Sequence, residues 1–386
     1  MCIQREAVGI LRDIYLDNAA TTKPFDEVCD AVIAAMKNDY GNPSSLHSKG
    51  YEAEIIVSDA RREIAKALDA NSKDIIFMSS GTEANNFAIF NACRAGHIIT
   101  TMTEHASILQ PLSELKNRGC RIDFVNVGND GLIDMQMLES LITKATALIA
   151  VTHVNSETGT VQDIDGISKV RDKKNPDALL LCDCVQSFCK LKIFPGRSGV
   201  DFASVSSHKI HGPKGISALY MSKRVKAQPR VFGGGQEKGL RSGTENVPAI
   251  VGFGYAARRM WMTQSDNYAE MSSLKACFLE LMDSSGLKYH TISNDNASSP
   301  YIVNIGFEGV NAEVLLRFLS QRGIYVSAGS ACSTHKKTKS GTLTAMKIAD
   351  RYAKGAVRFS FSVNNTRNDL EETVAAIKSI VPGLVK

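Results

Sequence analysis

Residues 327–341 place one cysteine, Cys332, in a run of small and polar side chains. Cysteine is among the residues most often buried in apolar cores, and this run has no large apolar side chain with which to build one. We therefore expect a loop that displays the thiol. Four basic side chains follow it and would favour the nucleophilic thiolate, although each taken singly is more typical of a solvated loop: His335, Lys336, Lys337 and Lys339.

Lys209 lies between an apolar run and a Gly-Pro turn, in residues 206–215. A lysine at the edge of a sheet is desolvated, which lowers its pKa and makes its amine a usable nucleophile. Such an amine can form a Schiff base with an aldehyde cofactor. Taken alone, Lys209 fits a surface loop equally well, and that is how we interpret Lys214.

Asp183 follows residues 178–182, an apolar run typical of a buried strand. A carboxylate in that position needs a cationic or hydrogen-bonding partner, and the protonated ring nitrogen of pyridoxal phosphate is one. A helix N-cap is the alternative. Cys182 and Cys184 flank Asp183, but a Cys-x-Cys pair without a second pair of ligands favours buried strand cysteines, and we expect no metal.

Gly81 and Thr82 follow a strand-like run and precede an apolar helical stretch. The first turn of a helix has unpaired backbone N–H groups that can bind a phosphate. Taken alone, the same pattern is more typical of an ordinary capped helix. It is not a Walker A motif, because no Gly-Lys-Ser/Thr follows.

Two further residues have the chemistry of a site for an amino acid. His105 ends another strand-like run and could serve as an acid or base if it stacked on a pyridine ring, although a histidine at a helix start is the alternative. Arg358 lies among apolar neighbours and needs an anion, either a substrate carboxylate or a structural ion-pair partner. Together with the three features above, these residues predict an enzyme that uses pyridoxal phosphate and binds an amino acid.

The elements that must position these residues alternate between short apolar runs and helical stretches up to about residue 260. This alternation predicts a mostly parallel sheet with helices on both faces, with the ligand at the carboxyl ends of the strands. The expected strands are 14–16, 74–78, 97–101, 122–127, 147–151, 178–181, 202–205 and 217–221. The expected helices are 25–36, 52–68, 82–95, 107–118, 135–142 and 167–171.

The chain after residue 260 differs and predicts a smaller α+β domain. We expect helices over 268–281, 312–321 and 370–380, and strands over 301–305, 324–326 and 356–360. We therefore predict a large cofactor-binding domain over 15–260. The small domain would comprise 1–14 and 261–386 and would carry the cysteine loop of about 327–341.

The composition is that of an ordinary globular protein, with 44% hydrophobic and 22% charged residues. The net charge of +5 is too small to predict direct nucleic-acid binding. No apolar run reaches the roughly 18 residues of a membrane span, and the N-terminus has no signal-peptide core. Nine scattered cysteines indicate reduced thiols and, with the rest, a cytoplasmic protein.

Several stretches, in order along nearly the whole chain, resemble the cysteine desulfurases of the class V aminotransferase family. The stretches are 15–22, 41–45, 103–105, 153–159, 207–209, 233–237, 241–244 and 357–360, together with the Ser-Ala-Cys of the cysteine loop. The resemblance implies a fold-type I pyridoxal-phosphate enzyme, α/β, with a mostly parallel sheet of the seven-stranded type. It also implies a homodimer with the cofactor near the interface.

The resemblance also implies residue roles. Lys209 would carry the cofactor and move protons, Asp183 would hold the pyridinium, Gln186 would reach the ring oxygen, and His105 would stack on the ring. The phosphate would be bound by Gly81, Thr82, Ser206 and His208, with Thr244 reaching across from a second subunit. The substrate carboxylate would be held by Asn155, which would also touch the cofactor, and by Arg358, helped by Asn18.

The implied reaction converts L-cysteine to L-alanine and leaves the sulfur as a persulfide on Cys332, for transfer to an acceptor in iron–sulfur cluster assembly, tRNA thiolation or another sulfur pathway. Three alternatives stay open. A selenocysteine lyase would use the same site, and an aminotransferase would not need Cys332. A partner-dependent sulfur-relay platform would turn over slowly alone.

The sequence departs from the family pattern in three places. Ser80 stands where a glycine is usual, Cys184 replaces an alanine after Asp183, and residues 338–348 are altered. The chain ends at Lys386, so the C-terminal tail with which housekeeping members dock scaffold proteins is expected to be shortened.

Overall fold

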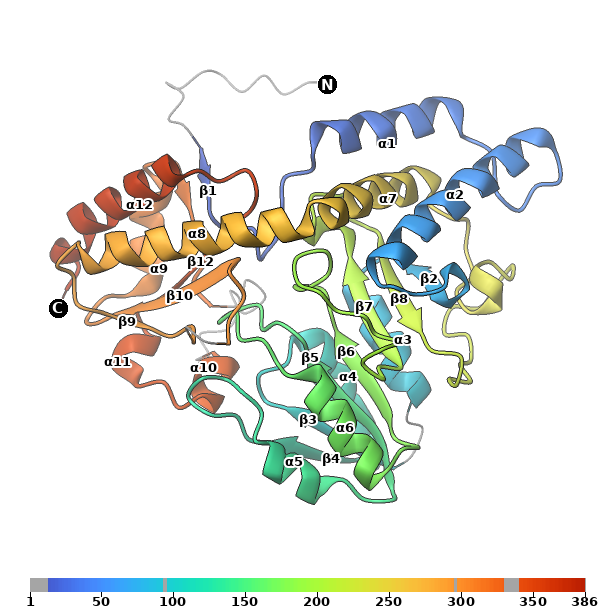
Figure 1. Ribbon diagram of the computed structural model, residues 1–386, viewed down its shortest axis with the longest axis horizontal. Coiled ribbons are helices and arrows are strands. Elements are labelled where there is room, and N and C mark those ends of the chain that lie inside the picture. The colour runs from blue at the N-terminus through green and yellow to red at the C-terminus, as the bar shows by residue number, and fades with distance from the viewer. Residues whose placement is uncertain (1–12, 93–95, 295–296, 330–339, 386) are drawn as a thin grey trace.

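A computed structural model describes residues 13–92, 96–294, 297–329 and 340–385. A seven-stranded sheet with the order β2-β8-β7-β6-β5-β3-β4 forms its centre (Figure 1). All of its strands are parallel except β8, which runs antiparallel to both of its neighbours. The strands are β2 (Ile75–Met78), β3 (His97–Thr101), β4 (Arg121–Val125), β5 (Thr146–Thr152), β6 (Leu179–Asp183), β7 (Phe202–Ser206) and β8 (Ser217–Met221).

The central strands are apolar throughout because helices cover both faces of the sheet. Alternate residues of each strand belong to two different cores: Leu181 packs with α3 and α4, whereas Leu180 and Cys182 pack on the opposite face. The helices that follow the early strands are α3 (Gly81–Ala92), α4 (Ala106–Asn117), α5 (Met135–Leu141) and α6 (Ile164–Lys174). This α/β architecture confirms the predicted fold class.

Three helices form a layer beside β2 and β8: α1 (Asp26–Asn38), α2 (Ser48–Ala67) and α7 (Val247–Met262) (Figure 1). Asn246 caps the N-terminus of α7, since its side chain accepts a hydrogen bond from the backbone N–H of Ala249. It packs closely on α2, because a Cβ atom added to Gly254 would lie 2.7 Å from the Cα of Ala60. Sequence analysis did not predict α7, although it placed the other helices of this region.

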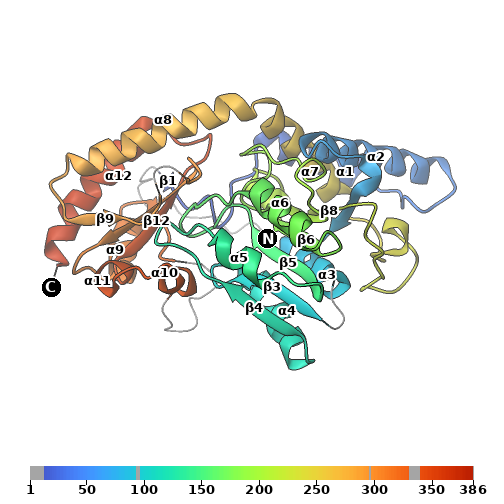
Figure 2. The ribbon, with the colours of Figure 1, turned by 60° about the horizontal axis from the view of Figure 1, so that its bottom comes forward.

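The C-terminal part of the chain forms a second, smaller sheet with the order β12-β10-β9, which α8 and α12 cover (Figure 2). Strand β1 (Ile14–Tyr15) joins this part by pairing in parallel with β11 (Ile324–Tyr325). The strands are β9 (Tyr289–Thr291), β10 (Ile302–Phe307) and β12 (Ala356–Ser360). The helices are α8 (Gln264–Asp283), α9 (Ala312–Ser320), α10 (Gly341–Ala345), α11 (Asp350–Ala353) and α12 (Arg367–Ile380). The domain boundaries remain a prediction.

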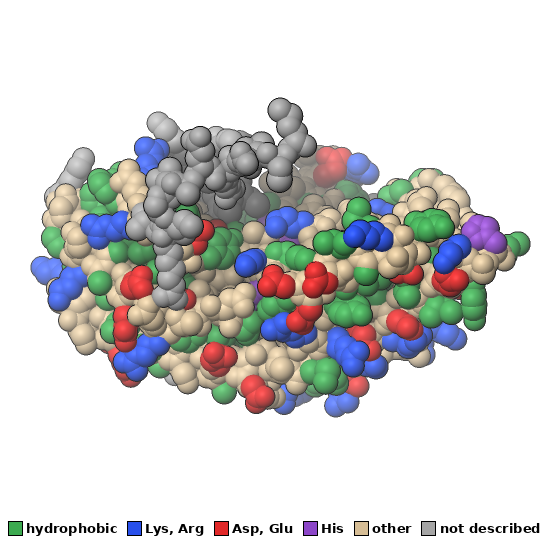
Figure 3. Space-filling model, turned by 90° about the horizontal axis from the view of Figure 1, so that it is seen from above, with side chains coloured by type: hydrophobic (Ala, Val, Ile, Leu, Met, Phe, Trp, Pro, Cys, Tyr) green, Lys and Arg blue, Asp and Glu red, His purple; other side chains and the backbone are tan. Residues whose placement is uncertain are grey.

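Figure 3 shows charged side chains of both signs interspersed over one face of the molecule. This agrees with the small net charge of +5. Within the described ranges, no helix combines the length and the apolar character that a membrane crossing requires.

Candidate functional site

The carboxyl ends of the parallel strands bring together the predicted cofactor residues. Asp183 is the last residue of β6, and the backbone N–H of Val185 donates to its Oδ1 atom at 3.0 Å. Lys209 Nζ donates to the carbonyl of Ala19 at 2.5 Å, and Gln186 Nε2 donates to the same carbonyl at 2.8 Å. The amine and the amide predicted to contact the cofactor therefore meet at one carbonyl oxygen.

His105 lies next to this group and caps the N-terminus of α4. The backbone N–H of Ser107 donates to the Nδ1 atom of His105 at 3.1 Å, and the Ser107 Oγ atom lies 2.8 Å from that nitrogen. Asn85 Nδ2 donates both to Ser107 Oγ, at 2.9 Å, and to Asp183 Oδ2, at 2.8 Å. The predicted stacking histidine and the predicted pyridinium carboxylate are thus linked by two residues that sequence analysis did not single out.

The start of α3 forms the predicted phosphate end of the site. Thr82 is exposed there, whereas Gly81 packs so closely that a Cβ atom would lie 2.8 Å from Val185 Cγ2. Ser80 acts as a helix cap, because its Oγ atom accepts a hydrogen bond from the backbone N–H of Glu83 at 3.2 Å. The serine that replaces the usual glycine therefore leaves the N-terminus of the helix intact.

Two more predicted phosphate ligands come from the end of β7 and the turn after it. Ser206 ends β7 and is buried, and His208 follows in the 3-10 turn Ser207–Lys209. Burial lowers the pKa of His208 to about 3, helped by the positive charges of Lys209, Lys214 and Lys190. The imidazole is therefore neutral at physiological pH, with its Nδ1 atom 3.2 Å from Thr21 Oγ1.

Two buried ionisable groups border the site and have strongly shifted pKa values. Burial raises the pKa of Glu104 to about 7, although the hydroxyls of Thr152 and Thr101 donate to its carboxylate. Burial lowers the pKa of Lys190 to about 7, and the charge of Lys209 lowers it further. Clusters of buried groups with shifted pKa values are typical of functional sites.

Arg358 lies in the middle of β12, as predicted, and is almost fully buried. Its Nη2 atom donates to Asp17 Oδ1 at 2.6 Å and its Nη1 atom donates to the carbonyl of Ser156 at 2.8 Å. Its Nε atom is buried without a hydrogen-bond partner among the described residues. Arg358 therefore forms a structural ion pair with Asp17 and also keeps one donor, Nε, that could bind an anion.

The two asparagines predicted to bind the substrate carboxylate are engaged within the chain. Asn155 Nδ2 donates to the carbonyl of Thr103, and its Oδ1 atom accepts from the backbone N–H groups of Glu157 and Thr158. Asn18 Nδ2 donates to the carbonyl of Ser360 at 2.9 Å. The side chain that contacts Arg358 directly is Asp17, the neighbour of Asn18, which sequence analysis quoted in a motif but assigned no role.

Two predicted residues stand apart from this cluster. Thr244 is exposed on this chain, in the segment before α7. Cys332 lies outside the described residues, as do the basic side chains after it.

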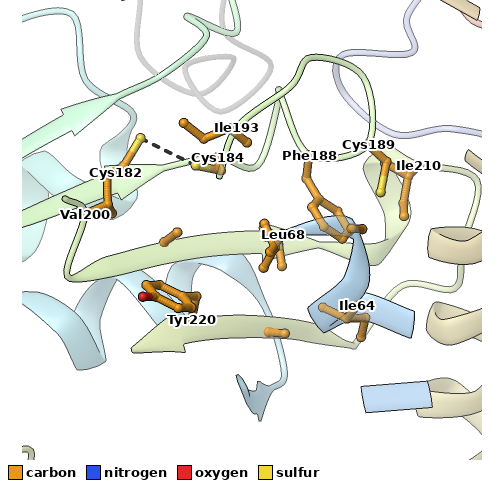
Figure 4. Packing of buried hydrophobic residues seen from close by; sticks show 14 of the residues in the cluster. Ile64, Leu68, Cys182, Cys184, Phe188, Cys189, Ile193, Val200, Ile210 and Tyr220 are labelled. Atoms are coloured by element: carbon orange, nitrogen blue, oxygen red, sulfur yellow. Dashed lines mark hydrogen bonds between the residues drawn. The ribbon is translucent and has the colours of Figure 1, made fainter. Parts of the chain in front are cut away.

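Cys182 and Cys184 are fully buried in the core of the large sheet, with their sulfur atoms 3.4 Å apart (Figure 4). Burial is also the main cause that raises the pKa of Cys182 well above its usual value. Their complete burial among apolar side chains fits the role of core cysteines.

The assembled groups can hold an aldehyde cofactor that carries a phosphate and a basic ring nitrogen. They comprise an amine, a carboxylate, an amide, an imidazole and a helix N-terminus. Gln186 Oε1 is buried here without a hydrogen-bond partner in the described part of the chain. Buried polar atoms are rarely left unpaired, so this atom suits a polar ligand.

Comparison with known proteins identifies the family of this chain. The model of the aminotransferase class-V family matches residues 14–373. A cysteine desulfurase IscS of Dictyoglomus turgidum is 35% identical, with 97% of this chain and 95% of the relative covered. A putative cysteine desulfurase IscS 1 of Bacillus subtilis is 36% identical, covering 96% and 99%.

A solved structure of a NifS-like protein superposes with a TM-score of 0.91 at 33% identity, covering 97% of this chain and 100% of the other. The chain therefore belongs to the aminotransferase class-V family and, within it, to the group of the cysteine desulfurases.

Proposed function

We propose that this chain is a cysteine desulfurase that uses pyridoxal phosphate to convert L-cysteine to L-alanine and keeps the sulfur as a persulfide on Cys332. The observation that carries the proposal is the convergence of Lys209 and Gln186 on the carbonyl of Ala19. Burial lowers the pKa of His105, the charge of Asp183 opposes this and the charge of Lys209 adds to it, so both charged groups lie near the imidazole. The desulfurase names of the related proteins support the same activity.

Each residue of the site has a task toward the cofactor. Lys209 provides the amine that attaches it, Asp183 pairs with its ring nitrogen, and His105 covers its ring. The first turn of α3, at Gly81 and Thr82, binds the phosphate together with Ser206 and His208. When bound, pyridoxal phosphate withdraws electrons from the α-carbon of the substrate.

The substrate carboxylate binds to the guanidinium of Arg358 through the buried Nε atom that has no partner in the described ranges. Asp17 holds the other side of the guanidinium, so its plane is set before the substrate arrives. The remaining amide hydrogen of Asn155 can assist. The fixed carboxylate orients the amino acid, and Lys209 then exchanges protons at its α-carbon.

Cys332 completes the reaction as the nucleophile. Its thiolate attacks the sulfur of the bound L-cysteine, the carbon–sulfur bond breaks, and its electron pair remains on the carbon skeleton. That carbon takes up a proton and the product leaves as L-alanine, while Cys332 keeps the sulfur as a persulfide. An acceptor protein or thiol then takes the sulfur, in iron–sulfur cluster assembly or another sulfur pathway.

The chain functions as a homodimer in this proposal, with Thr244 binding the phosphate in the partner's site. Its exposure on this chain agrees with such a role. Large apolar side chains exposed on α1 and α2, among them Met36 and Tyr51, provide surface that a second copy could cover. Light scattering of the purified protein tests the dimer.

The experiment that tests the activity measures alanine and sulfide together from L-cysteine, with and without a thiol acceptor, on wild type and Cys332→Ala. We expect one alanine per sulfide from wild type. The variant should keep the absorbance of the bound cofactor but lose sulfide release. Unchanged sulfide release from the variant would remove Cys332 from the mechanism and favour a lyase.

The same assay distinguishes the other activities. An aminotransferase would form an oxo acid from L-cysteine rather than alanine. A selenocysteine lyase would turn over L-selenocysteine efficiently and L-cysteine hardly at all. A sulfur-relay platform would stay slow with free L-cysteine even when a small thiol acceptor is supplied.

A further inference from the structure

Asn85 lies between Asp183 at the end of β6 and Ser107 at the start of α4. It lies in the second turn of α3, is completely buried, and donates both hydrogens of its side-chain amide. One goes to Asp183 Oδ2 on β6 and the other to Ser107 Oγ on α4, at 2.8 and 2.9 Å. No helix-packing requirement explains an amide at this position, since neighbouring buried positions of α3 are alanine and phenylalanine.

The orientation of this amide follows from its partners. If the nitrogen and oxygen of Asn85 were exchanged, the amide oxygen would face the carboxylate of Asp183 with no hydrogen between them. The nitrogen must therefore face Asp183, and both of its hydrogens are used. The Oδ1 atom is left buried without a partner in the described part of the chain, which costs about 1–3 kcal/mol.

The same reasoning fixes the proton on His105. Ser107 Oγ accepts from Asn85, so the hydroxyl hydrogen of Ser107 is available for His105 Nδ1, 2.8 Å away. The backbone N–H of Ser107 also donates to that nitrogen. Nδ1 is therefore an acceptor, and the single proton of the neutral ring lies on Nε2.

Asp183 is held in a comparable way. Its Oδ1 atom accepts from the backbone N–H of Val185 and its Oδ2 atom accepts from Asn85. One hydrogen bond to each oxygen fixes the plane of the carboxylate, and each oxygen keeps a lone pair for another donor.

We propose that Asn85 is a positioning residue that acts on two members of the site at once: it orients the carboxylate of Asp183 and, through Ser107, keeps the proton of His105 on Nε2. The proposal rests on the proposed function, in which Asp183 and His105 face the cofactor. Asn85 itself acts only through its two partners.

The test compares Asn85→Leu, which keeps the size of the side chain but removes both donors, with Asn86→Leu as a matched control. Asn86 is the next residue of α3, and its side chain donates only to the carbonyl of Thr82 on its own helix. The first readout is the ¹⁵N chemical shift of the His105 ring nitrogens in the cofactor-free protein near pH 8. His105→Gln identifies the signals among the eight histidines.

Wild type and Asn86→Leu should show one tautomer, with Nδ1 unprotonated, whereas Asn85→Leu should show a mixture. In the loaded enzyme, kcat for L-cysteine should fall about 10- to 100-fold in Asn85→Leu, by analogy with the loss of a hydrogen-bond partner that orients a metal-ligating histidine. If Asn85→Leu keeps the single tautomer and the kcat of the control, Asn85 is a structural residue only and the proposal is wrong.

Ser107→Ala keeps the test decisive if Asn85→Leu does not fold. It removes the hydroxyl link to His105 while Asn85 still donates to Asp183. The proposal expects a changed His105 tautomer in this variant, and an unchanged tautomer contradicts it. Because the NMR readout needs neither cofactor nor substrate, its outcome stands even if the proposed desulfurase activity fails its own test.

Discussion

The two ends of the central sheet both bury charged and polar side chains, but they pair them differently. At the amino ends of β6 and β7, Asp201 accepts hydrogen bonds from the backbone N–H of Leu180 and from Ser222, and pairs with Arg171 and Arg224. Arg171 in turn donates to the carbonyls of two loops and to Ser168. Most buried polar groups described at this end therefore find partners within the chain, although Arg171 Nε is in an ion pair with Asp172 and has no hydrogen bond among the described residues.

The carboxyl ends of the same strands leave polar atoms unused. Among the described residues, the buried atoms near this end that lack a hydrogen-bond partner include Asn85 Oδ1, Gln186 Oε1 and, from the neighbouring small sheet, Arg358 Nε. Burying a polar atom without a partner is unfavourable, and a bound ligand can supply one. We infer that the amino ends stabilise the fold, whereas the carboxyl ends are arranged for a ligand, and each prediction below tests that difference.

The largest effect is expected at the carboxyl ends, for Lys209→Ala. Without the amine, turnover of L-cysteine should fall by more than about 1,000-fold, because both attachment of the cofactor and proton transfer are lost. The urea midpoint of the cofactor-free chain should change little. Lys214→Ala, an exposed lysine of the same turn, is the control and should keep wild-type turnover. Retention of turnover within tenfold in Lys209→Ala would contradict the proposed site.

The next effect is expected at the amino ends, for Asp201→Ala. Removing the carboxylate leaves the buried Arg171 without its buried ion-pair partner, with only the exposed Asp172 remaining, which costs up to about 3–5 kcal/mol. The urea midpoint, followed by circular dichroism, should fall accordingly, while kcat per folded molecule stays unchanged. Asp172→Ala serves as the control, since Asp172 pairs with the same arginine from the surface and should contribute less than about 1 kcal/mol. A variant of normal stability but low kcat would reverse the assignment of the two ends.

An intermediate effect is expected for Arg358→Lys. A lysine keeps the positive charge but cannot hold a carboxylate and Asp17 with two fixed donors at once. Loss of one charge-assisted hydrogen bond, about 1.5–3 kcal/mol, should raise KM for L-cysteine roughly 10- to 150-fold. The concentration dependence of the spectral change on adding L-cysteine checks this without relying on turnover.

Arg351→Lys is the matched control for this change, because Arg351 is exposed and its ion pair with Glu308 lies at 3.7 Å. It should leave KM unaltered. An equal rise in both variants would mean that Arg358 has no specific contact with the substrate.

The difference between the two ends also explains what could be predicted from the sequence. The central strands were predicted because parallel strands buried on both faces form short apolar runs, as at residues 178–181. Helix α7 was missed because Gly252 and Gly254 lower its helix propensity, and only the close packing on α1 and α2 explains why glycine is needed. The edge strand β9 was also missed, because its three residues, Tyr289–Thr291, do not form an apolar run like those of the central strands.

For the site, too, only residues that stand out in a local sequence pattern could be predicted. Lys209 and Asp183 could be predicted, because each follows an apolar strand, and Arg358 because it interrupts one. Asn85 could not, since an asparagine inside a helix becomes informative only when its partner, 98 residues away, is known. The ionic contact between Asp17 and Arg358 joins residues even further apart in the sequence, and no local pattern encodes it.

The smallest effect compares one histidine from each end of the sheet. His153 follows β5 at the carboxyl end, and burial lowers its pKa to about 4, opposed only by the charge of Asp165. His97 begins β3 at the amino end, and burial lowers its pKa; Asp123, 3.1 Å away, opposes this lowering, whereas the charge of Arg121 adds to it. Folding therefore disfavours the protonated form of both histidines, but more so for His153, because His97 has a nearby carboxylate that stabilises its positive charge.

The sign of the pH dependence follows from these shifts. Between about pH 6.5 and 4 the unfolded chain binds a proton at His153 that the folded chain does not, so stability is complete above that range and is lost as the pH falls through it. One such proton contributes a slope of at most about 1.4 kcal/mol per pH unit. We expect His153→Gln to flatten the dependence of the urea midpoint between pH 6.5 and 5 more than His97→Gln does. Equal flattening would show that Asp123 gives His97 no advantage, and that the pairing of polar groups at the amino ends is weaker than the geometry indicates.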